Sequence, residues 1–221
     1  MSCFGMNKGL DYINERRRMV EEQIRARGVS DERVIRAMLE VPRHRFVPPG
    51  QQVFAYEDQP LPIGYGQTIS QPYIVAFMIE ALGTAPSDRV LEIGTGSGYA
   101  AAVLSRVAAE VYSIETLAPL AEAAKKTIEG LGYTNVHLRT GDGTKGWPEE
   151  APFDAILVSA GAPVVPESLV GQLTPGGRLV IPVGDRIDQR LLRITRNVSG
   201  ELQEDELAIV RFVPLIGAEG W

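Results

Sequence analysis

The sequence predicts a doubly wound α/β fold, in which helices pack on both faces of a mostly parallel sheet. From residue 88 onward, short apolar runs alternate with longer amphipathic segments. Near the C-terminus, two strand-like runs are joined by a turn-rich link that leaves no room for a helix. Alternation of strand and helix implies parallel strands with right-handed crossovers. We therefore expect a Rossmann-like sheet with an antiparallel C-terminal edge pair and an N-terminal helical extension.

The length of 221 residues suits one domain with a continuous apolar core. We divide that domain into three parts. Residues 1–87 hold the helices and a loop region, residues 88–182 form the core, and residues 183–221 form the strand pair and tail.

The first third reads as helices. Residues 12–27 carry apolar side chains at helical spacing, and Ser30 is the expected N-cap of a second helix that ends at Pro42. Residues 42–71 are rich in Pro, Gly and Gln, which indicates an ordered loop region. Pro72 suits the first turn of the next helix.

The core follows as alternating strands and helices. The expected strands are 89–93, 110–114, 136–140, 153–159 and 178–182. The expected helices are 99–107, 117–131 and 166–173. In the tail, residues 190–196 and 207–213 are the strand-like runs, and we expect them to pair antiparallel at the edge of the sheet.

Composition and charge exclude several classes of protein. No run of eighteen apolar residues occurs, and Arg16, Arg17 and Arg18 are not followed by an apolar stretch, so neither a membrane span nor a secretory signal is expected. The single cysteine, Cys3, favours a reducing, cytoplasmic location. The net charge of −6 is unfavourable for a nucleic-acid partner.

Three glycines follow the first core strand at every second position: Gly94, Gly96 and Gly98. Glycine lets the chain turn sharply at the end of a strand and lets backbone N–H groups approach a ligand. A dinucleotide fingerprint would read G-x-G-x-x-G, but here Tyr99 stands where the third glycine would fall. Glu92, just before the turn, suits a cation better than a phosphate. The pattern therefore points to S-adenosylmethionine, a sulfonium nucleoside without phosphates.

Two further acids follow the next two strands. Glu115 lies 21 positions after Gly94, near the spacing of about 20 residues for an acid that accepts from ribose hydroxyls. Asp142, between two glycines, suits an exocyclic adenine amine. Each feature alone also has a purely structural explanation as a turn or a solvated acid, but together they indicate a nucleoside site.

This conjunction resembles the class I S-adenosylmethionine-dependent methyltransferases. The resemblance covers residues 88–182 and implies which residues hold the cofactor. They are Glu92, Gly94, Gly96 and Gly98 for the methionine part, Glu115 for the ribose, and Asp142 with Gly143 for the adenine.

Residues 62–72, Pro-Ile-Gly-Tyr-Gly-Gln-Thr-Ile-Ser-Gln-Pro, resemble the signature of the protein-L-isoaspartate O-methyltransferase family. Similar segments recur at 153–156, 162–166, 173–179 and 212–215, so the resemblance covers nearly the whole chain after residue 12. It implies methyl transfer to the α-carboxylate of isoaspartyl residues in damaged proteins, as the first step of repair. It also implies that Ser70 is catalytic and that Gln67, Thr68 and Ile69 bind the substrate.

The implied methyl transfer requires the carboxylate and the methyl group to be aligned, and it does not require a base. A carboxylate with a pKa of about 3.5 is already ionised at neutral pH, so no proton has to be removed. The two histidines, His44 and His137, lie outside the motifs, and no metal is expected. The alternative role for Ser70 is a plain helix cap.

Two other functions stay open at this stage. One is a methyltransferase for a small molecule or a nucleic-acid base, although Ser-Ala-Gly-Ala at 159–162 replaces the Asn/Asp-Pro-Pro-aromatic tetrad typical of amino-methylating enzymes. The other is a non-catalytic protein that binds the nucleoside. Residues 1–11 and 217–221 match no family pattern, and the sequence does not indicate an oligomeric state.

Overall fold

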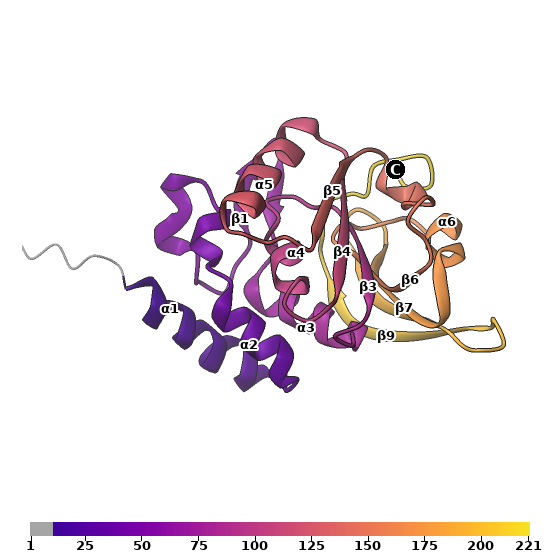
Figure 1. The fold of residues 1–221 in the computed structure, drawn as a ribbon, viewed down its shortest axis with the longest axis horizontal. Helices are drawn as coiled ribbons and strands as arrows, with labels where there is room; N and C mark the ends of the chain where they lie inside the picture. Colours follow the sequence, from indigo (N-terminus) through magenta and orange to yellow (C-terminus); the bar gives the residue numbers. More distant parts are fainter. Residues whose placement is uncertain (1–10) are drawn as a thin grey trace, which may run out of the picture.

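A computed structural model describes residues 11–221. The expectation about Cys3 lies outside the described residues. The centre of the molecule is a seven-stranded sheet of order β5-β4-β3-β6-β7-β8-β9 (Figure 1). Its strands are β3 (Arg89–Ile93), β4 (Glu110–Glu115), β5 (Val136–Thr140), β6 (Phe153–Val158), β7 (Leu173–Gly184), β8 (Gln189–Arg196) and β9 (Leu202–Val210).

Strand direction in the sheet agrees with the predicted fold class. The pairs β3–β4, β3–β6, β4–β5 and β6–β7 are parallel, whereas β7–β8 and β8–β9 are antiparallel. The predicted antiparallel edge pair is therefore confirmed. Its last strand runs over 202–210 rather than the predicted 207–213, because the backbone of Phe212 bonds to the Gln189 side chain instead of continuing the ladder.

Two apolar clusters cover the two faces of the sheet, because successive strand residues point to opposite sides. Val90 belongs to the cluster under α3 (Pro72–Leu82), α4 (Tyr99–Leu104) and α5 (Ala118–Gly130). Leu91 belongs to the cluster under α6 (Glu167–Gly171) and the segment that carries Leu215. Pro72 opens α3 as predicted. The helices α4 and α6 end earlier than predicted, and β7 begins at Leu173 rather than at the predicted residue 178.

The N-terminal region is helical, as predicted, with local differences. Residues 12–27 form α1 (Tyr12–Arg18), a π-helical stretch η1 (Met19–Ile24) and a 3-10 turn η2 (Arg25–Arg27). The prediction that Ser30 caps the second helix is wrong. Asp31 caps α2 (Glu32–Glu40), since its carboxylate accepts from the Arg33 N–H at 2.8 Å, whereas the Ser30 N–H donates to Glu80 at 2.7 Å.

The predicted loop region 42–71 contains regular structure that the sequence analysis missed. Two 3-10 helices, η3 (Arg43–Phe46) and η4 (Pro49–Phe54), precede a hairpin of β1 (Leu61–Gly64) and β2 (Gln67–Ile69). The tight turn needs left-handed backbone at Gly64, Tyr65 and Gly66, which have φ of 95°, 52° and 70°. In residues 11–221, no helix combines the length and apolar character needed to cross a membrane.

Candidate active site

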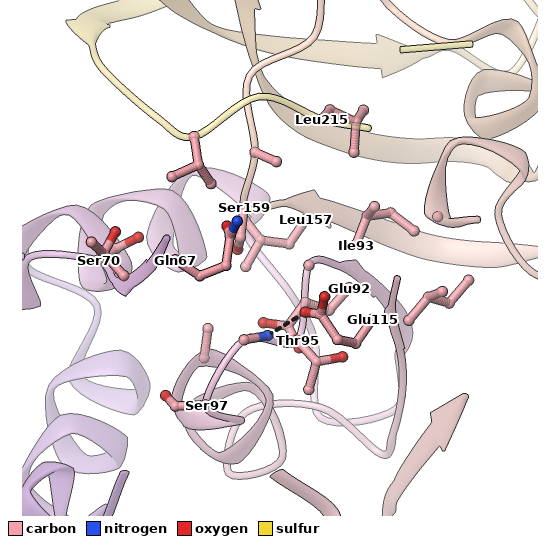
Figure 2. A pocket seen from close by; sticks show the side chains of 18 of the residues that line it. Gln67, Ser70, Glu92, Ile93, Thr95, Ser97, Glu115, Leu157, Ser159 and Leu215 are labelled. Carbon is pink, nitrogen blue, oxygen red and sulfur yellow. Dashed lines mark hydrogen bonds between the residues drawn. The ribbon is translucent and has the colours of Figure 1, made fainter. Parts of the chain in front are cut away.

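A cavity of about 230 Å³ lies at the carboxyl ends of β3, β4 and β6 (Figure 2). This is where ligands bind in open parallel sheets. Ser70 and Gln67 approach from one side, while Glu92 and Glu115 lie on another. A segment from the C-terminal tail, residues 213–216, completes the lining.

The glycine turn shapes the floor of the cavity. Gly94 and Gly96 line it with φ of 92° and 54°, a backbone region that side chains rarely adopt. Gly98 does not line it. A Cβ there would lie 3.2 Å from Ile128 on α5, so this glycine permits close helix packing.

Glu92 is fully buried and lines the cavity from the end of β3. Its Oε2 accepts from the Ser113 hydroxyl at 2.5 Å, and the Ser113 Oγ lies 2.6 Å from the Thr95 Oγ1. Its Oε1 has no hydrogen-bond partner. Burial raises the pKa of Glu92 to about 8, with Ser113 opposing this rise and Glu115 adding to it. An unpaired buried acceptor is unfavourable, so the site suits a ligand that brings a cationic donor.

Glu115, the last residue of β4, binds the glycine turn and the segment after β4 with its two carboxylate oxygens. Oε2 accepts from the Gly96 N–H at 2.8 Å, and Oε1 accepts from the Leu117 N–H at 3.0 Å. A carboxylate has about four lone-pair sites. Two lone-pair sites therefore remain on Glu115, which is the number needed to accept from the two hydroxyls of a ribose.

The structure separates the two residues predicted for the adenine. Gly143 lines the cavity, and a Cβ there would clash with the Ile93 Cγ2 methyl. Asp142 does not line it. Its Oδ1 accepts from the N–H and hydroxyl of Thr144 at 2.9 and 2.7 Å, and its Oδ2 accepts from the Ala218 N–H at 2.9 Å. Asp142 thus caps the 3-10 turn η5 (Gly143–Lys145) and tethers the tail, keeping one lone pair on Oδ2.

Residues 67–70 all line the cavity from β2 and the link to α3. The N-cap of α3 is Gln71, without a side-chain cap bond, so Ser70 does not act as the cap of this helix. The Ser70 carbonyl accepts from the Arg43 Nη2 at 2.7 Å.

Neither histidine lines the cavity. His44 stacks on Tyr12 with ring centroids 4.0 Å apart and bonds to Tyr56, while His137 bonds to Glu110. Within residues 11–221, no group of His, Cys, Asp and Glu side chains is arranged to hold a metal ion.

Several residues that line the cavity were not predicted from the sequence. Leu215 and Ile216 reach the cavity because the tail runs back along the residues after β6, where the Leu215 N–H donates to the Gly161 carbonyl at 2.8 Å. The similarity of residues 212–215 to the family was the available signal. Thr95, which lines the cavity, and Ser113, which binds Glu92 behind it, carried no such signal, because buried hydroxyls next to an acid have no sequence pattern.

A mostly parallel sheet whose glycine turn and two strand-tip acids line one cavity is the arrangement of the class I S-adenosylmethionine-dependent methyltransferases. The model of the family described as Protein-L-isoaspartate(D-aspartate) O-methyltransferase (PCMT) matches residues 14–220. The chain belongs to this protein-L-isoaspartate O-methyltransferase family.

Similar proteins support this family assignment over most of their length. A protein-L-isoaspartate O-methyltransferase of Pelotomaculum thermopropionicum is 63% identical over 207 residues, which cover 94% of this chain and 90% of that protein. One from Roseiflexus sp. is 58% identical over 212 residues, which cover 96% of each.

Solved structures support the same family assignment. A structure named protein-L-isoaspartate O-methyltransferase superposes with a TM-score of 0.83 at 34% identity, covering 93% of this chain and 67% of that one. A Plasmodium falciparum structure described as a protein-L-isoaspartate O-methyltransferase, in complex with S-adenosyl-L-homocysteine, has a TM-score of 0.78 at 28% identity, covering 91% of this chain and 98% of that one.

The chain is accordingly an enzyme that transfers a methyl group from S-adenosylmethionine to the α-carboxylate of L-isoaspartyl residues in damaged proteins. The two alternatives from the sequence, another acceptor and a non-catalytic binder, are not supported.

Proposed function

We propose that the cavity holds the cofactor between the glycine turn and residues 67–70, and that Ser70 steadies the acceptor carboxylate beside it. One observation carries this proposal: Ser70 lines the same cavity as Glu92 and Glu115, and its hydroxyl does not serve as the cap of α3.

The residues fit S-adenosylmethionine. The unpaired Glu92 Oε1 would accept from the ammonium of its methionine part, close to Gly94 and Gly96. The two free lone pairs of Glu115 would take the ribose hydroxyls. Gly143 would admit the adenine ring, and the remaining lone pair of Asp142 would accept from its amine. When bound, the cofactor supplies a methyl group on a positively charged sulfur.

The protein aligns the acceptor carboxylate with the methyl group and excludes water from the site. The acceptor carboxylate is ionised at neutral pH, and no lysine, arginine or histidine is among the described residues that line the cavity. One carboxylate oxygen forms a bond to the methyl carbon as the sulfur–carbon bond breaks. The products are the methyl ester and S-adenosylhomocysteine, and no proton is transferred. Ser70 would donate to the other oxygen, which keeps the attacking oxygen in line.

Apolar side chains would exclude water from this step. Ile69, Leu157 and Leu215 line the cavity and are buried. The reaction neutralises opposite charges, so a site with few waters does not favour the separated ions. Gln67 and Thr68, beside Ser70 on the hairpin, would contact the substrate chain.

The proposal also concerns partners and organisation. The substrates would be extended, damaged segments, whose ester then closes to a succinimide without the enzyme. The net charge of −6 supports a partner other than nucleic acid, and the single cysteine supports a reducing, cytoplasmic location. Parts 1–87, 88–182 and 183–221 would act as one methyltransferase domain, because all three contribute lining residues.

Paired peptides test the acceptor. One peptide carries a single isoaspartate and its twin carries aspartate at the same position, and both are incubated with labelled S-adenosylmethionine. We expect label on the isoaspartyl peptide only. Equal labelling of both would refute the proposed specificity, and cofactor binding without label on either would support a non-catalytic role.

A further inference from the structure

Arg43, in η3, is a fully buried cation without an ion-pair partner among the described side chains. Its Nε donates to the Ala55 carbonyl and its Nη2 to the Ser70 carbonyl, each at 2.7 Å. Its Nη1 has no hydrogen-bond partner. A buried charge is normally paired, because removing it from water is unfavourable. The exception calls for a functional explanation.

The guanidinium joins the two halves of the active site. Ser70 belongs to the acceptor side of the cavity, and Tyr99 directly follows the glycine turn on the cofactor side. The Arg43 guanidinium lies over the Tyr99 ring, 4.9 Å from its centroid, while it holds the Ser70 carbonyl. Rigid forked donors are what make arginine suited to fixing backbone in this way.

The charge of Arg43 also matters for the acceptor. Glu92 and Glu115 line the cavity, and no basic side chain of the described residues does. Where these acids are ionised, they disfavour a second anion nearby. Arg43 is an uncompensated positive charge in contact with Ser70. Burial lowers its pKa to about 10, which leaves the guanidinium protonated at neutral pH.

We propose that Arg43 is a positioning residue that fixes Ser70 and supplies the positive field by which the enzyme selects an ionised carboxylate as its methyl acceptor. This inference rests on the proposed role of Ser70. It assigns selection for charge to a residue that does not itself line the cavity.

The test compares Arg43→Met with the wild-type enzyme. Two peptides are titrated into the complex with S-adenosylhomocysteine: the isoaspartyl peptide, and the same peptide with its α-carboxylate converted to a carboxamide. We expect the wild type to bind the carboxylate form about tenfold more tightly, a discrimination typical of a charge-assisted contact. Arg43→Met should bind the two peptides equally, with unchanged affinity for S-adenosylhomocysteine.

Arg178→Met is the matched control. Arg178 also holds backbone carbonyls, those of Leu82 and Gly83, but it lies away from the cavity and pairs with Asp88. Its variant should keep the wild-type preference for the carboxylate. A folded Arg43→Met enzyme that keeps this preference would overturn the inference.

Arg43→Lys keeps the charge but loses the forked donor, and it also serves if the methionine variant does not fold. It should retain the preference for the carboxylate while kcat falls about tenfold, because the Ser70 carbonyl loses its anchor. A lysine variant without the preference, or with wild-type kcat, would contradict the proposal. A wild-type enzyme that fails to methylate the isoaspartyl peptide would refute the proposed function itself.

Discussion

The Ser113 hydroxyl donates to one oxygen of Glu92 at 2.5 Å, while the other oxygen of this fully buried carboxyl has no partner. Thr95 lies behind Ser113, at 2.6 Å between the two hydroxyl oxygens. One oxygen of the carboxyl is therefore fixed by Ser113, and the other is buried without a partner beside the cavity that Glu92 lines. This arrangement is unfavourable in the free protein and favourable once a cation is bound.

The first prediction concerns the proton on Glu92. Its pKa of about 8 in the ligand-free enzyme means that it is mostly protonated at pH 7. Contact with an ammonium favours the ionised form, so binding of S-adenosylhomocysteine should release up to about one proton at pH 7. Calorimetry in buffers of different ionisation enthalpy measures this number. The Glu92→Gln enzyme should release no proton from this position and should bind S-adenosylhomocysteine about tenfold more weakly.

The same pKa affects the stability of the ligand-free enzyme. The folded value lies above the value of an unfolded glutamate, so the folded state holds more protons between about pH 4.5 and 8. The contribution of Glu92 to the free energy of unfolding is fully present below this window. It is lost as pH rises through the window, by at most about 1.4 kcal/mol per pH unit. Denaturant unfolding at several pH values checks this, and Glu92→Gln should have the flatter profile. Equal profiles would contradict the assignment.

The second residue to test is Ser70. Ser70→Ala should lower kcat/KM for the isoaspartyl peptide about tenfold to a hundredfold, the usual range for a lost bond to a charged group. Affinity for S-adenosylhomocysteine should change less than about twofold. Ser199→Ala, in an exposed turn, is the control and should behave as wild type. Unchanged turnover of Ser70→Ala would remove Ser70 from the mechanism.

A glycine comparison tests the packing at the adenine end. Gly143→Ala would place a methyl against Ile93, and overpacking of this kind destabilises by about 1–3 kcal/mol. We expect a lower Tm and weaker S-adenosylhomocysteine binding. Gly141→Ala is the matched control, since its Cβ would meet only the Arg139 side chain at 3.7 Å. Similar losses in both variants would argue against a specific role for position 143.

Asp142 links the core to the tail. Asp142→Ala removes the cap of η5 and the bond to the Ala218 N–H, so it should cost about 0.5–2 kcal/mol and speed amide exchange in residues 217–221. Asp11→Ala removes a similar pair of backbone bonds at the exposed start of α1 and should leave exchange in the tail unchanged. Slow exchange of the tail in Asp142→Ala would show that other contacts hold it.

Much of the fold was predictable because its signals are local. The strands β3 and β5 match their predicted bounds, since apolar runs bounded by turn residues define a strand without long-range information. The cap of α2 was misassigned to Ser30 because Glu80, fifty positions away, binds the Ser30 backbone. The hairpin of β1 and β2 was missed because three successive residues, including Tyr65, adopt positive φ.

The candidate site was predictable where residues follow strand ends. Glu92, Glu115 and the first two glycines line the cavity because parallel strands end at the same edge. Gly98 and Asp142 are not among the residues that line the cavity. Gly98 packs on α5 and Asp142 binds the tail, and both contacts depend on segments distant in the sequence. The isolated charge of Arg43 has no sequence pattern, because only the fold shows that no acid lies beside it.

A crystal structure of the enzyme with S-adenosylhomocysteine and an isoaspartyl peptide tests the central claim most directly. We predict that the ammonium lies within hydrogen-bonding distance of the Glu92 Oε1, and that the Ser70 hydroxyl donates to the peptide carboxylate next to the sulfur. A nucleoside bound outside this cavity, or a Ser70 side chain turned away from the carboxylate, would contradict it.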